Sequence, residues 1–448
     1  MFGELSIAII FFFFILDGVR YGWGKNLATS FWVFTLFFTL SYPVKYILIS
    51  NGVDYQAPKK PGEFSLAIAL AFAMGIWLLI YFLKGRPFKV DPKLLHQTAP
   101  AHAKGSKWGI APKMFFTLII CVSSAAYYNL YTSVGHFSLA FQGNTQNEMR
   151  VGQGGYFALF TLYFYVFLIA LFSRHTLGYR FGAVLIVSIL VLGMSQMVQL
   201  GTRRPLYLIG YAILLYWATQ KSSSKRLLIL GIYPVVMALL APVGQVLRYS
   251  FASIFQNQWI TPNDTLDFVL VSIGSTFEGV EHLANYFEIA TADKLILGVD
   301  QGISWLFNSG LSLMSRALWE SKPYLYGSVS QQAFLYHEMY QTGYGQTTLP
   351  PGFIVDAIFG FGFIEIFLFG FFYAYLFRYL DKVLFSRTEW FRYDYLIAAT
   401  IYINMFNLVR GGTAVIMMIV FLMAIAVPIH LVNRIRLRRL GAVDFSHR

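Results

Sequence analysis

Charged residues are scarce in this chain of 448 residues. They make up 12% of it, whereas hydrophobic residues make up 57% and aromatic residues 18%. Soluble globular domains carry roughly 25% charged residues. The low charge, together with apolar runs of about 20 residues, excludes a soluble globular protein and a disordered chain. It predicts a polytopic integral membrane protein.

Cysteine and the common cofactor motifs are also lacking. The only cysteine, Cys121, lies inside an apolar run, so an intrachain disulfide is excluded. The sequence has neither the Gly-rich loop that binds nucleotide phosphates nor a His-Glu-x-x-His zinc motif. We therefore expect no cofactor and no metal site. The long apolar runs also exclude an outer-membrane β-barrel.

Eleven apolar runs have spanning or near-spanning length. They cover residues 2–16, 27–49, 64–83, 114–131, 155–173, 181–200, 206–218, 227–246, 353–377, 393–409 and 413–432. The Arg-rich tail predicts a cytoplasmic C-terminus, and eleven spans then put the N-terminus on the periplasmic side. In this arrangement 23 of the 34 basic residues lie inside. The net charge of +13 is thus expected to set the orientation and not to bind nucleic acid.

The runs divide the chain into four parts. Residues 1–247 hold eight spans, residues 353–432 hold three, and residues 433–448 form the basic tail. Between them, residues 248–352 are too rich in charged and turn residues to span, so we expect a large helical periplasmic loop that caps the bundle. In this loop Thr261 and Pro262 form an N-cap signal, which predicts a helix over residues 263–291.

Arginines gather at the expected periplasmic ends of several spans. Arg203 and Arg204 lie in the turn between two spans, and Arg248 and Arg410 end two others at the same depth. A guanidinium binds phosphate oxygens through a planar fork of N–H donors. Several arginines at one cavity would repel one another unless an anion neutralised them, so they predict a bound pyrophosphate or other polyanion. The alternative is that each one anchors its helix at the lipid headgroups.

Two pairs of acid/base residues lie in the expected periplasmic loop. Glu278 and His282 are spaced i and i+4, with Glu281 beside them, and His337 is a second candidate next to Glu338. A carboxylate at this spacing can orient an imidazole for proton transfer. The alternative is an ordinary solvated helix face. Ionisable residues within or at the ends of spans would instead favour a transporter: Lys45, Asp356, Glu365 and Asp394.

This pattern resembles the bacterial oligosaccharide repeat-unit polymerases, the O-antigen polymerase (Wzy-type) family. The resemblance rests on about a dozen helices, the turn Gly201-Thr202-Arg203, the large late loop and the Gly-rich aromatic segment 349–362. Arg316 and Gly327 also fit an Arg-x10-Gly spacing described for some members, although chance produces this spacing too.

The resemblance implies a GT-C-like glycosyltransferase of the bacterial inner membrane that needs no metal. Its donor is the growing glycan on undecaprenyl pyrophosphate, and its acceptor is a lipid-linked repeat unit. Arginines stabilise the departing pyrophosphate, and a Glu or His deprotonates the attacking hydroxyl. Membrane lipids, a chain-length regulator and a flippase are the implied partners. An O-antigen ligase and an exporter of lipid-linked or polyanionic material remain as alternatives.

Overall fold

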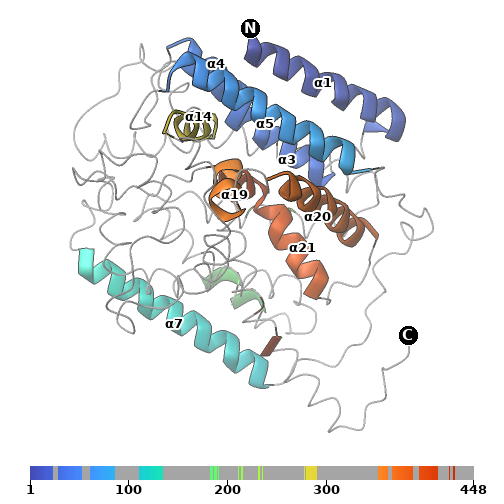
Figure 1. Cartoon of the computed structure of the whole chain (residues 1–448). Coiled ribbons are helices and arrows are strands. Elements are labelled where there is room, and N and C mark those ends of the chain that lie inside the picture. The colour runs from blue at the N-terminus through green and yellow to red at the C-terminus, as the bar shows by residue number, and fades with distance from the viewer. Residues whose placement is uncertain are drawn as a thin grey trace, which may run out of the picture.

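The structure is a computed structural model, and its regular elements are helices (Figure 1). It describes residues 1–23, 29–52, 61–85, 110–134, 277, 279–289, 352–361, 366–386 and 393–411, with short stretches between 182 and 235 and between 423 and 428. No strand occurs in these segments, which agrees with the expected all-α class. The spans expected at 155–173, 181–200, 206–218, 227–246 and 413–432 lie wholly or largely outside them, so the number of spans stays a prediction.

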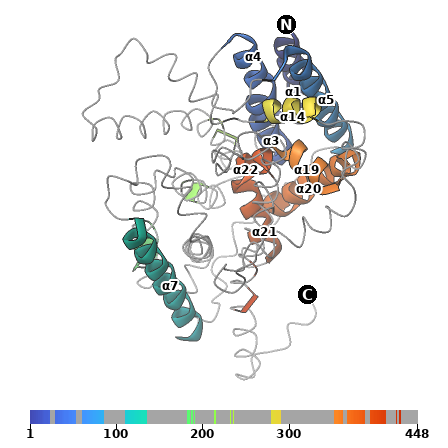
Figure 2. The same ribbon diagram turned by 60° about the vertical axis from the view of Figure 1, so that its left-hand side comes forward.

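Three helices are long and apolar enough to cross a membrane: α1 (Phe2–Tyr21), the continuous helix Ser30–Ser50, and α5 (Glu63–Leu83). They contain 20, 21 and 21 residues. At about 1.5 Å per residue each measures about 30 Å, the thickness of a bilayer's hydrocarbon core. A fourth helix, α7 (Ile110–Val134), covers the run expected at 114–131 and lies apart from these three in both views (Figures 1 and 2).

Helices α1 and α20 (Ile366–Ser386) turn large apolar side chains outward. The exposed side chains recur at the three- and four-residue spacing of one helix face. Contiguous apolar surface of this kind is costly in water and suits contact with lipid tails. It therefore supports a membrane protein. These side chains are Phe2, Leu5, Phe11, Phe12 and Val19 on α1, and Phe367, Leu368, Phe371 and Phe372 on α20.

The second long helix changes its pitch in the middle. It consists of α3 (Ser30–Thr39), the π-helical turn η1 (Leu40–Val44) and α4 (Lys45–Ser50). Pro43 lies inside η1. Proline lacks an N–H donor and its ring crowds the preceding turn, so a widened turn accommodates it without ending the helix. The side chains of Ser41, Tyr42 and Lys45 are all buried around this turn.

One of the expected spans is wrong as a single straight helix. The run 353–377 is formed by α19 (Phe353–Phe361) and the first part of α20, which continues to Ser386. The rings of Phe353 and Tyr373 lie 5.5 Å apart, whereas twenty residues of one straight helix would separate them by about 30 Å. The run 393–409 is covered by α21 (Tyr393–Ile403) and α22 (Met405–Arg410), and the N–H of Asn404 between them still donates a helical hydrogen bond of 3.1 Å to the Thr400 carbonyl oxygen.

An aromatic core surrounds α3. Phe34 is fully buried, and its ring packs against the rings of Phe353, Tyr373 and Phe377. Helices α5, α20 and α22 and the short helix α14 (Val280–Ile289) complete the group around α3 and η1, as Figure 2 shows. Met1, Ser50 and Gly62 mark one end of this bundle, here called the Met1 end, and Lys84 marks the other.

Candidate functional site

Helix α14 buries two of the predicted acid/base residues inside the bundle. It packs against α5, α4, η1 and α19. The exposed fraction is 0% for Glu281 and 1% for His282. For these two residues the alternative of a solvated helix face is therefore wrong. Ionisable side chains are seldom fully buried unless they are paired, so their surroundings decide what they do.

Glu281 is fixed at both carboxylate oxygens by different parts of the chain. Its Oε1 lies 3.1 Å from Nζ of Lys45, which is 2% exposed, and its Oε2 accepts a hydrogen bond of 3.0 Å from the backbone N–H of Gly279. Removing a charge from water costs several kcal/mol, which the opposite charge offsets. The sequence marked Lys45 as an ionisable residue within a span, and the structure supplies its partner from the segment expected to be a loop.

Two glycines let the starts of α14 and α19 approach each other over Tyr42. A Cβ atom on Gly279 would lie 3.1 Å from the Ser41 carbonyl oxygen. A Cβ atom on Gly352 would lie 3.0 Å from the Tyr42 hydroxyl and 3.2 Å from Cα of Gly279. Gly352 also has a φ of 85°, which a residue with a side chain rarely adopts. The N-terminal ends of both helices, which carry partial positive charge, thus lie close together inside the bundle.

Arg410, one of the predicted pyrophosphate ligands, ends α22 beside these two helix starts. Its carbonyl oxygen accepts a hydrogen bond of 2.8 Å from the N–H of Gly352. Its guanidinium lies 5.2 Å from the centre of the Phe406 ring, which in turn packs against Phe277. Backbone contacts therefore connect Arg410, through its carbonyl oxygen and Gly352, to Gly279 and the Glu281 carboxylate. We call Tyr42, Lys45, Glu281, His282 and Arg410 the α14 cluster.

The α14 cluster contains only some of the residues predicted from the sequence. Glu281, His282 and Arg410 belong to it. Glu278, His337, Arg203, Arg204, Arg248 and Arg316 lie outside the described residues, so their roles stay predictions. Tyr42 and Lys45 were missed as members of the site. Pro43, which interrupts an otherwise apolar run, was the signal in the sequence that could have pointed to them.

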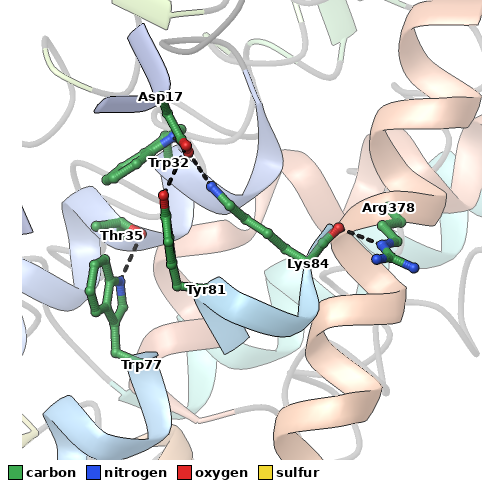
Figure 3. A network of polar contacts seen from close by, with 7 residues as sticks. All are labelled: Asp17, Trp32, Thr35, Trp77, Tyr81, Lys84 and Arg378. Carbon is green, nitrogen blue, oxygen red and sulfur yellow. Dashed lines mark hydrogen bonds and ion pairs between the residues drawn. The ribbon is translucent and has the colours of Figure 1, made fainter. Parts of the chain in front are cut away.

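A second polar network ties the helices together at the Lys84 end (Figure 3). Asp17 on α1 accepts hydrogen bonds of 3.2 Å from Trp32 Nε1 and 2.9 Å from the Tyr81 hydroxyl, and it pairs with the ammonium of Lys84. The backbone carbonyl of Lys84 accepts a hydrogen bond from Arg378. The Lys84 ammonium also lies 4.2 Å from the centres of the Phe31 and Tyr81 rings. Because donors occupy both oxygens of Asp17, this network is best explained as a link between α1, α3, α5 and α20.

In the segments that the structure describes, no group of three His, Cys, Asp or Glu side chains is arranged to hold a metal ion.

Comparisons of the chain with protein-family models, with curated proteins and with solved structures found no match. What the α14 cluster does must therefore be inferred from its own contacts.

Replacing Gly352 with alanine is expected to loosen the α14 cluster. The positive φ and the nearby Tyr42 hydroxyl both oppose a Cβ atom, and a residue held in such a conformation costs about 1 to 3 kcal/mol. Thermal unfolding in detergent measures the loss. Gly75→Ala on α5 is the matched control, because a Cβ atom there would meet nothing within 4 Å. Equal unfolding temperatures for the two variants would contradict the close approach at Gly352.

Proposed function

We propose that the chain is a membrane glycosyltransferase that polymerises undecaprenyl-pyrophosphate-linked oligosaccharide repeat units. The product would be an O-antigen or exopolysaccharide, made on the periplasmic face of the bacterial inner membrane. The observation that carries this proposal is the α14 cluster. It joins Glu281 and His282, predicted as acid/base residues, to Arg410, predicted as a pyrophosphate ligand from a distant part of the sequence.

The proposed reaction is one displacement at a sugar carbon. A hydroxyl of the acceptor repeat unit attacks the anomeric carbon of the growing glycan, and the Glu281 carboxylate takes its proton. The new C–O bond forms as the bond from that carbon to the lipid pyrophosphate breaks, and the pyrophosphate leaves with the bonding electrons. Arginines stabilise the negative charge of this leaving group. Arg410 does so from the α14 cluster, and Arg203, Arg204, Arg248 and Arg316 are proposed to act with it.

Access to Glu281 requires α14 to move. Glu281 and His282 are closed off from solvent in the structure, so a sugar reaches them only when α14 separates from its neighbours. The far end of this helix packs against α5: Phe287 packs edge-on against Phe72, and Glu288 accepts a hydrogen bond from the N–H of Gly62 at the start of α5. We propose that this ten-residue helix closes over the substrates and excludes water during the reaction.

Purified protein in vesicles separates this function from its alternatives. With lipid-linked repeat units as the only substrate, we expect a ladder of glycan lengths. An exporter would move the substrate across the membrane at constant length, and a ligase would add glycan only when a lipid A core acceptor is supplied. Either of these results, in place of the ladder, would contradict the polymerase assignment.

A further inference from the structure

We infer that Lys45 is a positioning residue for Glu281: its ammonium holds the carboxylate in place at the start of α14. This inference rests on the proposed function, since it takes Glu281 as the group that accepts the proton. Lys45 touches no reacting atom in this account. It acts through the ion pair with Glu281, which measures 3.1 Å.

The π-helical turn is what places Lys45 opposite Glu281. Lys45 is the first residue of α4 and directly follows η1. A π-turn contains one residue more than an α-turn, so it rotates the residues that follow by about 100° about the helix axis. Without that extra residue, the Lys45 side chain would leave the helix in a different direction. The sequence thus maintains an irregular turn that directs one lysine into the bundle.

The carboxylates of Glu281 and Asp17, each paired with a lysine, differ in the hydrogen bonds that they accept. Asp17 accepts hydrogen bonds at both oxygens, from Trp32 and Tyr81, in addition to its pairing with Lys84. In the part of the chain that the structure describes, Glu281 accepts a hydrogen bond at Oε2 only, and Oε1 faces the Lys45 ammonium without accepting one. Oε1 of Glu281 is thus held by the Lys45 ammonium, and it is the oxygen that we propose to accept the proton. Both oxygens of Asp17, in contrast, already accept hydrogen bonds from the bundle.

The ion pair also decides where the buried carboxylate of Glu281 lies. Removing a charge from water costs several kcal/mol, which the ammonium at 3.1 Å offsets. A neutral side chain at position 45 would remove the contact that holds Oε1. We therefore expect such a variant to be less stable and its Glu281 carboxylate to be displaced.

Exchanging the two charges tests the inference. The double variant Lys45→Glu, Glu281→Lys restores an ion pair but moves the carboxylate from α14 to α4. We expect its unfolding temperature to lie within a few degrees of that of the wild type, a difference of about the size that surface substitutions cause. We also expect it to make no polymer. The single variants should unfold earlier. Recovery of both stability and polymer formation would overturn the inference, because the pair would then serve the fold alone.

Lys45→Arg provides a second test on a variant that keeps the positive charge. We expect its unfolding temperature to match that of the wild type. Because the guanidinium of arginine is larger than the ammonium, it should displace the Glu281 carboxylate, so we expect a tenfold or greater fall in kcat with little change in KM. Lys84→Arg at the other ion pair is the control and should change neither constant. An unchanged kcat in Lys45→Arg would overturn the positioning role even if the exchanged pair failed to fold.

The same set of proteins separates failure of this inference from failure of the proposed function. If the wild type makes no polymer from lipid-linked repeat units, the proposed function is wrong, whatever the variants do. If the wild type makes polymer and Lys45→Met retains more than about half of its rate, the proposed function stands and the role of Lys45 is wrong.

Discussion

Glu281→Gln is expected to lower the rate of polymer formation by about 100-fold to 10,000-fold, the usual contribution of a general base. Glutamine keeps the size of the side chain and can still accept the hydrogen bond from Gly279, but it cannot take a proton from the acceptor hydroxyl. The measurement is the initial rate of glycan elongation per mole of folded protein. Normalisation matters because the variant leaves the Lys45 charge buried without its partner.

Glu288→Gln is the matched control for this experiment. Glu288 lies on the same helix, seven residues further on, but its side chain is exposed. Its replacement should leave the rate of elongation within about twofold of the wild type, because glutamine can still accept the hydrogen bond from the Gly62 N–H. If Glu281→Gln and His282→Ala both keep more than about half of the rate, the base is neither residue. The predicted alternatives Glu278 and His337 would then be tested next.

Lys84→Met is expected to destabilise the protein by about 3 to 5 kcal/mol, because it leaves the Asp17 charge buried without its counter-ion. The double variant Asp17→Asn, Lys84→Met removes both charges and should be less destabilised than Lys84→Met alone. Unfolding in detergent, followed by tryptophan fluorescence, measures both free energies; Trp32 lies in direct contact with Asp17 and reports on this end of the bundle.

The control for this prediction is Arg20→Met, which removes an exposed charge near the same end of α1. Its effect on the free energy of unfolding should be within about 0.5 kcal/mol. Equal losses in Arg20→Met and Lys84→Met would show that the buried ion pair does not hold the helices together. None of these variants is expected to act through the α14 cluster, which lies toward the Met1 end.

Hydropathy located a helix that fills one apolar run, but it did not show where one run contains two helices. The run 64–83 differs from α5 by one residue at its start, because a spanning helix needs only length and apolar side chains. The run 353–377 is equally apolar, yet it contains two helices. Hydrophobicity does not specify the direction of a helix. The change of direction becomes visible only through contacts such as that between Phe353 and Tyr373.

The candidate site could be predicted only in part, because some of its features are local in the sequence and others depend on contacts between distant segments. The spacing of Glu278 and His282, the adjacent Glu281, and the position of Arg410 are local features of the sequence, so these residues could be identified as candidates. Their meeting depends on contacts between segments far apart in the chain: Lys45 with Glu281, and Gly352 with Arg410. No local pattern encodes such contacts. The sequence does not distinguish Gly279 and Gly352 from the other glycines, and their role becomes clear only from their short distances to Tyr42.

The measurement that tests the proposed function most directly is the amount of lipid pyrophosphate released for each glycosidic bond formed. Purified protein in detergent is given lipid-linked repeat units, and both products are counted over time. The proposed displacement predicts one undecaprenyl pyrophosphate released per bond, in step with the growing ladder, and neither product from Glu281→Gln above the background. Release of the carrier without chain elongation, or unchanged substrate in the presence of well-folded wild-type protein, would contradict it.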